Sequence, residues 1–205
     1  MMMAEVPKTR SKAARRTLLI MVTVFAVPYM LAWFLYFKPG ALELGTRNHG
    51  TMISPMIGPE QFQLVQLDGQ SPREAAGSDR WMLLSFGEGS CDADCEKTLF
   101  TMQQLRKMAG VEKTRLRRGY VVPMGAGGPG LESTLDQFQG TELLLADAPQ
   151  LQWLEQRLGI ETGELYLHII IADPEANLVM WYPREMDPKK IFADIEILFG
   201  RVKRV

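Results

Sequence analysis

Two cysteines, Cys91 and Cys95, lie four residues apart and form the clearest candidate for chemistry in the chain. They follow an apolar run at residues 81–86 that is typical of a buried strand, and they precede residues 96–109, whose apolar side chains recur at helical spacing. A thiol at the first turn of a helix faces unpaired backbone N–H groups and the positive end of the helix dipole, which favour the thiolate. This placement favours Cys91 as the nucleophile or first metal ligand.

The spacing of the pair is compatible with more than one chemistry. Helical rise places the two Cα atoms about 6 Å apart, which suits a disulfide, and the same closeness suits two thiolates that bind one soft cation. Glu88, Asp92, Asp94 and Glu96 surround the pair, and their negative charge attracts a cation while it disfavours a thiolate. The alternative is a structural disulfide or two inert thiols, although so short a loop gains little stability from closure.

Residues 17–37 contain no charged side chain, and at about 1.5 Å per residue they are long enough to cross a bilayer core of about 30 Å. The sequence therefore predicts a single transmembrane helix at 17–37, preceded by a basic N-terminus at 1–16. Basic residues are more frequent before this run, at Lys8, Arg10, Lys12, Arg15 and Arg16, than after it, at Lys38 and Arg47. This imbalance predicts an N-terminus in the cytoplasm and a C-terminal domain in the periplasm or its equivalent. A cleaved signal peptide is the alternative, but the run is long and lacks a clear small-x-small cleavage site.

The rest of the 205 residues are enough for one domain. Residues 38–59 are rich in Gly, Pro, Asn and Ser and are predicted to be a linker, followed by a folded domain at 60–205. The formal net charge is −1, with the acidic excess in the C-terminal part, so no nucleic-acid partner is expected. In an oxidising compartment the cysteine pair becomes a disulfide unless it is reduced or holds a metal.

The order of predicted elements indicates the fold class. Strands are predicted at 61–67, 81–86, 120–124, 143–145, 166–172 and 178–182, and helices at 96–109, 131–138, 149–158 and after Asp187. The basic residues 113–118 are interpreted as a solvated helix end. Alternating strands and helices, followed by a hairpin and a last helix, describe an α/β sheet with helices on both faces. The order is that of a thioredoxin-like fold, in which a cysteine pair after the first βα strand is the redox site.

The C-x-x-x-C spacing, the membrane segment, the helix after the cysteines and the strand and turn at 169–175 together resemble the SCO/SenC family. These are thioredoxin-like, membrane-anchored proteins of cytochrome c oxidase assembly, and the resemblance covers about residues 61–205. It implies that Cys91 and Cys95 bind Cu(I), and that the partners are an oxidase subunit or other assembly factors at the cytoplasmic (inner) membrane.

The family's third copper ligand is a histidine, and its position is occupied here by Leu165. His168 lies three residues further along the predicted strand, and an odd offset turns a side chain to the opposite face of a sheet. His168 is therefore expected to point away from the cysteines. If the chain turns earlier, His168 instead reaches the loop beside Cys91 and acts as the third ligand.

Three functions remain open for this sequence. The first is an SCO-like assembly factor that handles Cu(I) or reduces client thiols through the pair. The second is a metal-free thiol–disulfide oxidoreductase, so enzyme activity is an open question, and the third is a non-catalytic assembly scaffold. The spacing of the two histidines indicates no Ser-His-Asp set, and the glycine-rich loop at 125–130 lacks the signature of a phosphate-binding loop.

Overall fold

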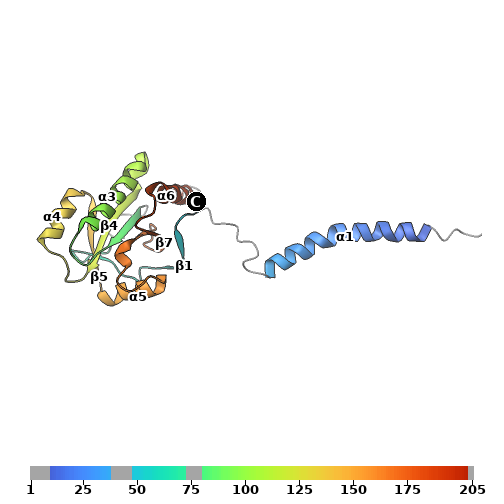
Figure 1. Cartoon of the computed structure of the whole chain (residues 1–205), viewed down its shortest axis with the longest axis horizontal. Coiled ribbons are helices and arrows are strands. Elements are labelled where there is room, and N and C mark those ends of the chain that lie inside the picture. Colours follow the sequence, from blue (N-terminus) through green and yellow to red (C-terminus); the bar gives the residue numbers. More distant parts are fainter. Residues whose placement is uncertain (1–9, 38–47, 73–79, 203–205) are drawn as a thin grey trace, which may run out of the picture. The chain divides into compact units, whose positions relative to one another are not determined.

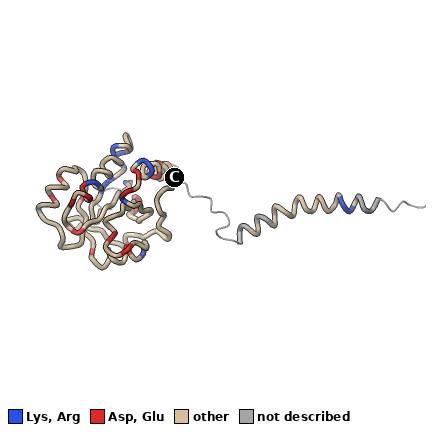
Figure 2. The backbone as a smooth tube through the Cα atoms, in the orientation of Figure 1, with Lys and Arg blue, Asp and Glu red and all other residues tan. Residues whose placement is uncertain are grey.

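The computed structural model describes residues 10–37, 48–72 and 80–202 (Figure 1). The chain divides into two compact units, residues 1–46 and 47–205. In the first unit, helix α1 (Arg10–Phe37) contains the uncharged run and Pro28, and its described charged residues lie near its beginning (Figure 2). No helix among the described residues is long and apolar enough to cross a membrane. The helix predicted at 17–37 is confirmed as part of α1. Its crossing of a membrane stays a prediction.

The second unit is built on a mixed sheet. Its described strands are β1 (Thr51–Ile57), β2 (Val65–Gln66), β3 (Trp81–Phe86), β4 (Leu116–Pro123), β5 (Thr141–Ala146), β6 (His168–Ala172) and β7 (Leu178–Pro183). They are arranged in the order β1-β7-β6-β3-β4-β5-β2. Strand β4 is parallel to both β3 and β5, and the remaining pairs are antiparallel. Every residue of β3 is buried, because β3 has a neighbouring strand on each side and helices over both faces.

Four helices among the described residues of this unit cover the sheet: α3 (Ala93–Met108), α4 (Pro129–Gln137), α5 (Ala148–Leu158) and α6 (Pro188–Val202). Two short 3-10 turns, η1 (Gly110–Arg115) and η2 (Leu165–Leu167), complete the described elements. Side chains alternate along β3, so Leu83 packs with Met102 of α3 and Ile195 of α6, whereas Leu84 packs with Leu154 of α5 on the other face. The predicted α/β sheet with helices on both faces is confirmed.

The predicted linker at 38–59 is wrong over part of its length. Residues Thr51–Ile57 form strand β1, which pairs antiparallel with β7 and buries Ile53 and Ile57. Composition was misleading here because an edge strand has only one neighbour and therefore tolerates Pro55. Residues 38–47 lie outside the described part. The strand predicted at 61–67 is reduced to Val65–Gln66.

The interpretation of the basic residues 113–118 as a solvated helix end is also wrong in part. Turn η1 ends at Arg115 and strand β4 begins at Leu116, so the last two arginines lie within the sheet. Arg118 is 1% exposed, and its Nη2 donates to the carbonyl of Gln139. Burial, followed by the nearby charge of Arg106, lowers the pKa of Arg118.

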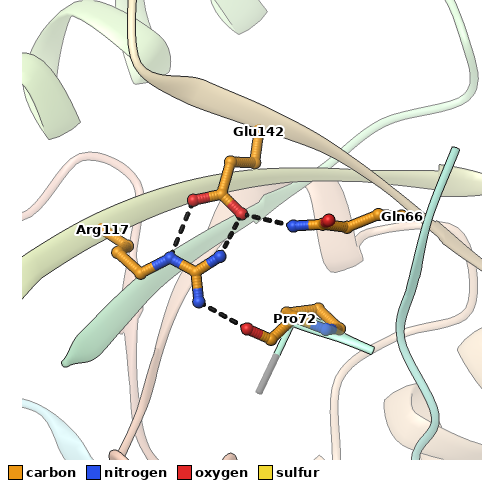
Figure 3. A network of polar contacts seen from close by, with 4 residues as sticks. All are labelled: Gln66, Pro72, Arg117 and Glu142. Carbon is orange, nitrogen blue, oxygen red and sulfur yellow. Dashed lines mark hydrogen bonds and ion pairs between the residues drawn. The ribbon is translucent and has the colours of Figure 1, made fainter. Parts of the chain in front are cut away.

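Arg117 joins three separate parts of the chain (Figure 3). Its Nε donates to Oε1 of Glu142 at 2.8 Å, its Nη2 contacts Oε2 of the same carboxylate, and its Nη1 donates to the carbonyl of Pro72 at 2.6 Å. Gln66 donates to Oε2 of Glu142 at 3.0 Å. This network ties β2, β4 and β5 together where β4 begins.

Asp194 of α6 holds the segment that enters β1. Its buried Oδ2 accepts hydrogen bonds from the backbone N–H groups of His49 and Gly50, at 2.8 and 2.9 Å, and from the hydroxyl of Tyr182 at 3.2 Å. A Cβ added at Gly50 would lie 2.3 Å from the Tyr182 ring. This position therefore requires glycine, and His49 is exposed at the surface.

Candidate functional site

The cysteine pair lies where β3 has ended and α3 begins, as the sequence predicts. Cys91 precedes the helix, Cys95 lies in its first turn, and the two sulfurs form a disulfide with a Cα–Cα distance of 5.2 Å. Both side chains are partly buried and pack against a cluster that includes Leu99 and Leu131. The pair is thus anchored in the domain and still reaches the surface.

Two glycines allow the turn between β3 and the cysteines. The Gly87 N–H donates to the carbonyl of Val121 at 2.9 Å, and a Cβ at this residue would lie 1.7 Å from the Tyr120 hydroxyl. Gly89 has a φ of +103°, and a Cβ there would lie 2.6 Å from the backbone nitrogen of Gly127. The turn therefore packs closely against β4 and the glycine-rich loop.

Two acidic side chains near the disulfide, Asp92 and Asp94, have partners within the protein. Asp92 is the N-cap of α3, and its Oδ1 accepts a hydrogen bond from the Cys95 N–H at 2.9 Å. Oδ2 of Asp94 forms an ion pair with Nη2 of Arg184 at 3.2 Å, with side chains that are 60% and 13% exposed. The Arg184 N–H in turn donates to the carbonyl of Leu167. Arg184 therefore links turn η2 to the first turn of α3.

A hollow of about 270 Å³ lies beside Cys95. Hydroxyl and charged side chains line it: Ser85, Glu88, Ser90, Asp92, Thr98, Tyr120, Tyr166 and Arg184. Burial, and then the negative charges of Asp92 and Glu88, raise the pKa of Tyr120 to about 12. Its hydroxyl therefore stays protonated and donates to the Ser90 carbonyl at 3.2 Å. Residue spacing does not point to Ser85, Tyr120, Tyr166 and Arg184, because they come from four separate segments of the chain.

His168 does not lie in this hollow. It opens β6, its Nδ1 is 3.0 Å from the carbonyl of Glu164, and its ring meets Trp181 edge-on with the centroids 4.9 Å apart. By alternation it shares the sheet face of Ile170, which packs in the core with Leu154 of α5. Burial lowers the pKa of His168, opposed by the contact with Glu164 and its charge.

The described residues do not bring three or more His, Cys, Asp or Glu side chains together as a group that could hold a metal. Cys91 and Cys95 are adjacent and, when reduced, have the soft donor chemistry that Cu(I) prefers. Leu165, at the position of the family histidine, is buried in the α5-side core. The role of His168 as a third ligand therefore stays a prediction.

A larger hollow of about 540 Å³ lies elsewhere on the domain. Its lining is largely apolar, including Phe62, Met82 and Leu178, and it also includes Arg117. Neither cysteine lines it. The position of the disulfide, and not the size of the hollow, therefore selects the candidate site.

Comparison with protein families assigns the domain to a class. The model described as "Transmembrane-like, thioredoxin-like, C-terminal domain" matches residues 81–200. The chain belongs to this family, which confirms the thioredoxin-like fold. Comparison with curated proteins finds no match.

Solved structures with a similar fold include several Sco proteins. The apo Sco1 protein from Thermus thermophilus is 17% identical with a TM-score of 0.52, and the match covers 77% of this chain and 99% of that one. BsSco, a member of the Sco family of cytochrome c oxidase assembly proteins in which a disulfide switch was identified, is 12% identical with a TM-score of 0.51 over 75% and 96%. Copper-bound ScoI from Bradyrhizobium japonicum is 16% identical with a TM-score of 0.47 over 72% and 97%. At these identities the similarity concerns the fold alone, and at that level the resemblance to Sco proteins is confirmed.

Proposed function

We propose that the protein is a membrane-anchored, Sco-like factor that acts in cytochrome c oxidase assembly through thiol–disulfide exchange and Cu(I) handling at Cys91 and Cys95. The observation that carries this proposal is the disulfide between two partly buried cysteines at the start of α3, beside a polar hollow. The description of BsSco as a Sco-family assembly protein with a disulfide switch supports it. A purely structural bridge is a poorer explanation, because closing so short a loop contributes little stability.

The exchange reaction takes place between the protein disulfide and a client dithiol, and each disulfide bond that forms replaces one that breaks. A client thiolate attacks one sulfur of the Cys91–Cys95 bond, which breaks as a mixed disulfide forms. The second client thiol then attacks the mixed disulfide, so the client is oxidised, and two electrons and two protons reach Cys91 and Cys95. The reverse direction reduces a client disulfide and requires an external dithiol to regenerate the protein.

Cu(I) binds to the cysteine pair in its reduced form. Two thiolates provide soft ligands for one Cu(I) as cargo. With the ring of His168 packed on Trp181, we expect this pair to bind Cu(I) more weakly than a site with two cysteines and one histidine.

Anaerobic titration of the reduced full-length protein with a competing Cu(I) chelator tests this role. We expect one Cu(I) per chain, with binding lost in Cys91→Ser and in Cys95→Ser. Unchanged affinity in both variants would overturn the copper role. Exchange activity without copper binding would instead support the metal-free oxidoreductase, and the absence of both would support the scaffold.

His168→Ala separates the two interpretations of the histidine. We expect Cu(I) affinity to change little, because the ring contacts Trp181 and the Glu164 carbonyl. A large loss of affinity, with the circular dichroism spectrum unchanged, would show that His168 is the third ligand.

The membrane anchor is proposed from α1. Residues 17–37 carry no charge, and large apolar side chains such as Phe25, Tyr29 and Met30 are exposed. A reporter fused after Val205 should be active only outside the cytoplasm, and the protein should resist extraction from membranes by alkaline carbonate. Activity of the fusion in the cytoplasm would contradict the predicted topology. A shortened mature chain would support a cleaved signal peptide.

A further inference from the structure

Ser85 lies at the hollow beside Cys95 with an unused hydroxyl. The residue is 1% exposed, and its Oγ has no hydrogen-bond partner within the described residues. It shares the α3 face of β3 with Leu83 and lines the hollow together with Thr98 and Cys95. Because a buried hydroxyl without a partner is unfavourable, a polar group from a bound molecule would stabilise this position.

Two other hydroxyls that line the hollow, those of Thr98 and Tyr120, are already engaged in hydrogen bonds. Thr98 donates to the carbonyl of Asp94 at 2.9 Å, and Tyr120 donates to the carbonyl of Ser90 at 3.2 Å. Of these three hydroxyls, the buried one of Ser85 is left to interact with a bound molecule.

The charge that remains uncompensated at the hollow is negative. Glu88 and Asp92 line it with exposed carboxylates, and their charges act on the Tyr120 hydroxyl, whose pKa they help to raise. The positive charge of Arg184 also lies there, but it is offset by its ion pair with Asp94. A cationic group is therefore favoured over an anionic one.

The size and surroundings of the hollow fit one side chain of a polypeptide. Its volume of about 270 Å³ is small for a cofactor site. A second hollow of about 220 Å³ shares Phe86, Gly87, Glu88 and Tyr166 with it. Leu151 and Pro123 contribute apolar surface to the second hollow. A chain that places one side chain beside Cys95 can therefore continue across Tyr166.

We propose that the hollow beside Cys95 binds a lysine or arginine side chain that neighbours the reactive cysteine of a client polypeptide. Glu88 and Asp92 attract the positive charge, and Ser85 Oγ accepts a hydrogen bond from the ammonium or guanidinium group. This inference rests on the proposed thiol–disulfide exchange at the same cysteine pair.

Matched peptides test the preference on the full-length oxidised protein in detergent micelles. Each peptide carries one cysteine in the same sequence, with Lys, Gln or Glu as its neighbour, and the rate of mixed-disulfide formation is measured. A neighbouring charge also alters the reactivity of the peptide thiol, so each rate is divided by the rate with bis(2-hydroxyethyl) disulfide. We expect the Lys peptide to react about tenfold faster than the Glu peptide at low ionic strength, with the ratio falling as salt is added.

Variants identify the residues responsible. Glu88→Gln should reduce the Lys-to-Glu ratio severalfold, and Ser85→Ala should slow the Lys peptide while leaving the Glu peptide unchanged. Glu96→Gln is the matched control, because Glu96 is an exposed carboxylate of α3 that does not line the hollow. Each peptide rate is also divided by the rate of the same protein with uncharged mercaptoethanol, which corrects for a general change in the reactivity of the disulfide.

A binding measurement separates failure of the inference from failure of the proposed function. Peptides with Ser in place of Cys cannot exchange, and calorimetry should show tighter binding of the Lys form than of the Glu form. Equal binding and equal normalised rates, with exchange intact, would overturn the basic-side-chain preference alone. Absence of exchange with every thiol, including mercaptoethanol, would overturn the proposed exchange and with it the inference.

Discussion

The polar side chains at the two ends of the parallel strands β3 and β4 differ in whether they have hydrogen-bond partners within the protein. Where β4 begins, Arg117, Glu142 and Gln66 satisfy one another and the Pro72 carbonyl (Figure 3). Where β3 finishes, Ser85 keeps a buried hydroxyl without a partner in the described residues, and the carboxylate of Glu88 is exposed. The first end uses polar groups to hold the domain together, whereas the second keeps polar groups available beside a disulfide.

The largest effect on stability should come from the network where β4 begins. Glu142→Gln leaves the Arg117 guanidinium, whose side chain is 11% exposed, without its charged partner, so we expect a loss of about 2 kcal/mol in the free energy of unfolding. Urea denaturation measures this loss, and the exchange rate of the folded protein should change less than twofold. Glu132→Gln, at an exposed carboxylate of α4, is the control and should be nearly neutral. If exchange also slowed strongly, the two ends would be coupled and the contrast would fail.

Tyr182 of β7 and Asp194 of α6 form a second buried polar cluster, whose groups also have partners within the protein. Tyr182→Phe removes the hydroxyl that donates to Asp194, and we expect a cost of about 1 kcal/mol at neutral pH. Burial, and then Asp194, raise the pKa of Tyr182 above its ordinary value of 10. The stabilisation linked to its proton is therefore complete below pH 10 and is lost as the pH rises above this value.

Unfolding measured from neutral to alkaline pH checks this dependence. Tyr182→Phe should flatten the alkaline decrease of the wild-type free energy of unfolding. Parallel curves for the two proteins would show that Tyr182 does not hold its proton more tightly in the folded state.

Asp92, at the start of α3, lies beside the disulfide and is expected to contribute to stability as a helix cap. Asp92→Ala removes the acceptor for the Cys95 N–H, and loss of such a cap costs about 1 kcal/mol. Asp92→Asn keeps an acceptor and should retain most of the stability while it removes the negative charge. Thermal unfolding of the two variants measures the cap, and equal destabilisation would mean that the charge, and not the hydrogen bond, stabilises the turn.

The smallest effect is expected at Ser85. Its hydroxyl has no partner among the described residues, so Ser85→Ala removes no internal hydrogen bond and should change the free energy of unfolding by less than about 0.5 kcal/mol. Urea denaturation decides the point. A loss greater than about 1 kcal/mol would show that the Ser85 hydroxyl has a hydrogen-bond partner within the protein. The difference between the two ends of the strands would then disappear.

Features that depend on neighbouring residues could be predicted. The strand at 81–86 has the predicted bounds, and the turn after Ala172 closes with the Asp173 N–H donating to the carbonyl of Asn177. The last helix begins after Asp187, whose Oδ1 accepts from the N–H of Lys189. Hydrophobic periodicity and capping chemistry are local, so the sequence displays them directly.

Features that depend on distant pairing could not be predicted in this way. The sequence predicts that the arginines at the start of β4 are exposed to solvent, because it displays their charge and not their pairing with β5 and β2. Strand β1 is not predicted from the sequence, because the described strand that pairs with it, β7, lies far along the chain. Local composition carries no information on either partner.

The α/β class, the strand that ends before the cysteines and the helix that begins at them can be predicted from the amino-acid sequence, because each follows from residue spacing along one segment. The surroundings of the disulfide, in contrast, depend on how distant segments pack together. Tyr166 comes from η2 and Arg184 from the segment after β7, and both line the hollow beside Cys95 because the sheet places β6 next to β3 and β7 next to β6. The same sheet places His168 against Trp181, since alternation along a strand sets which face of a sheet each side chain occupies.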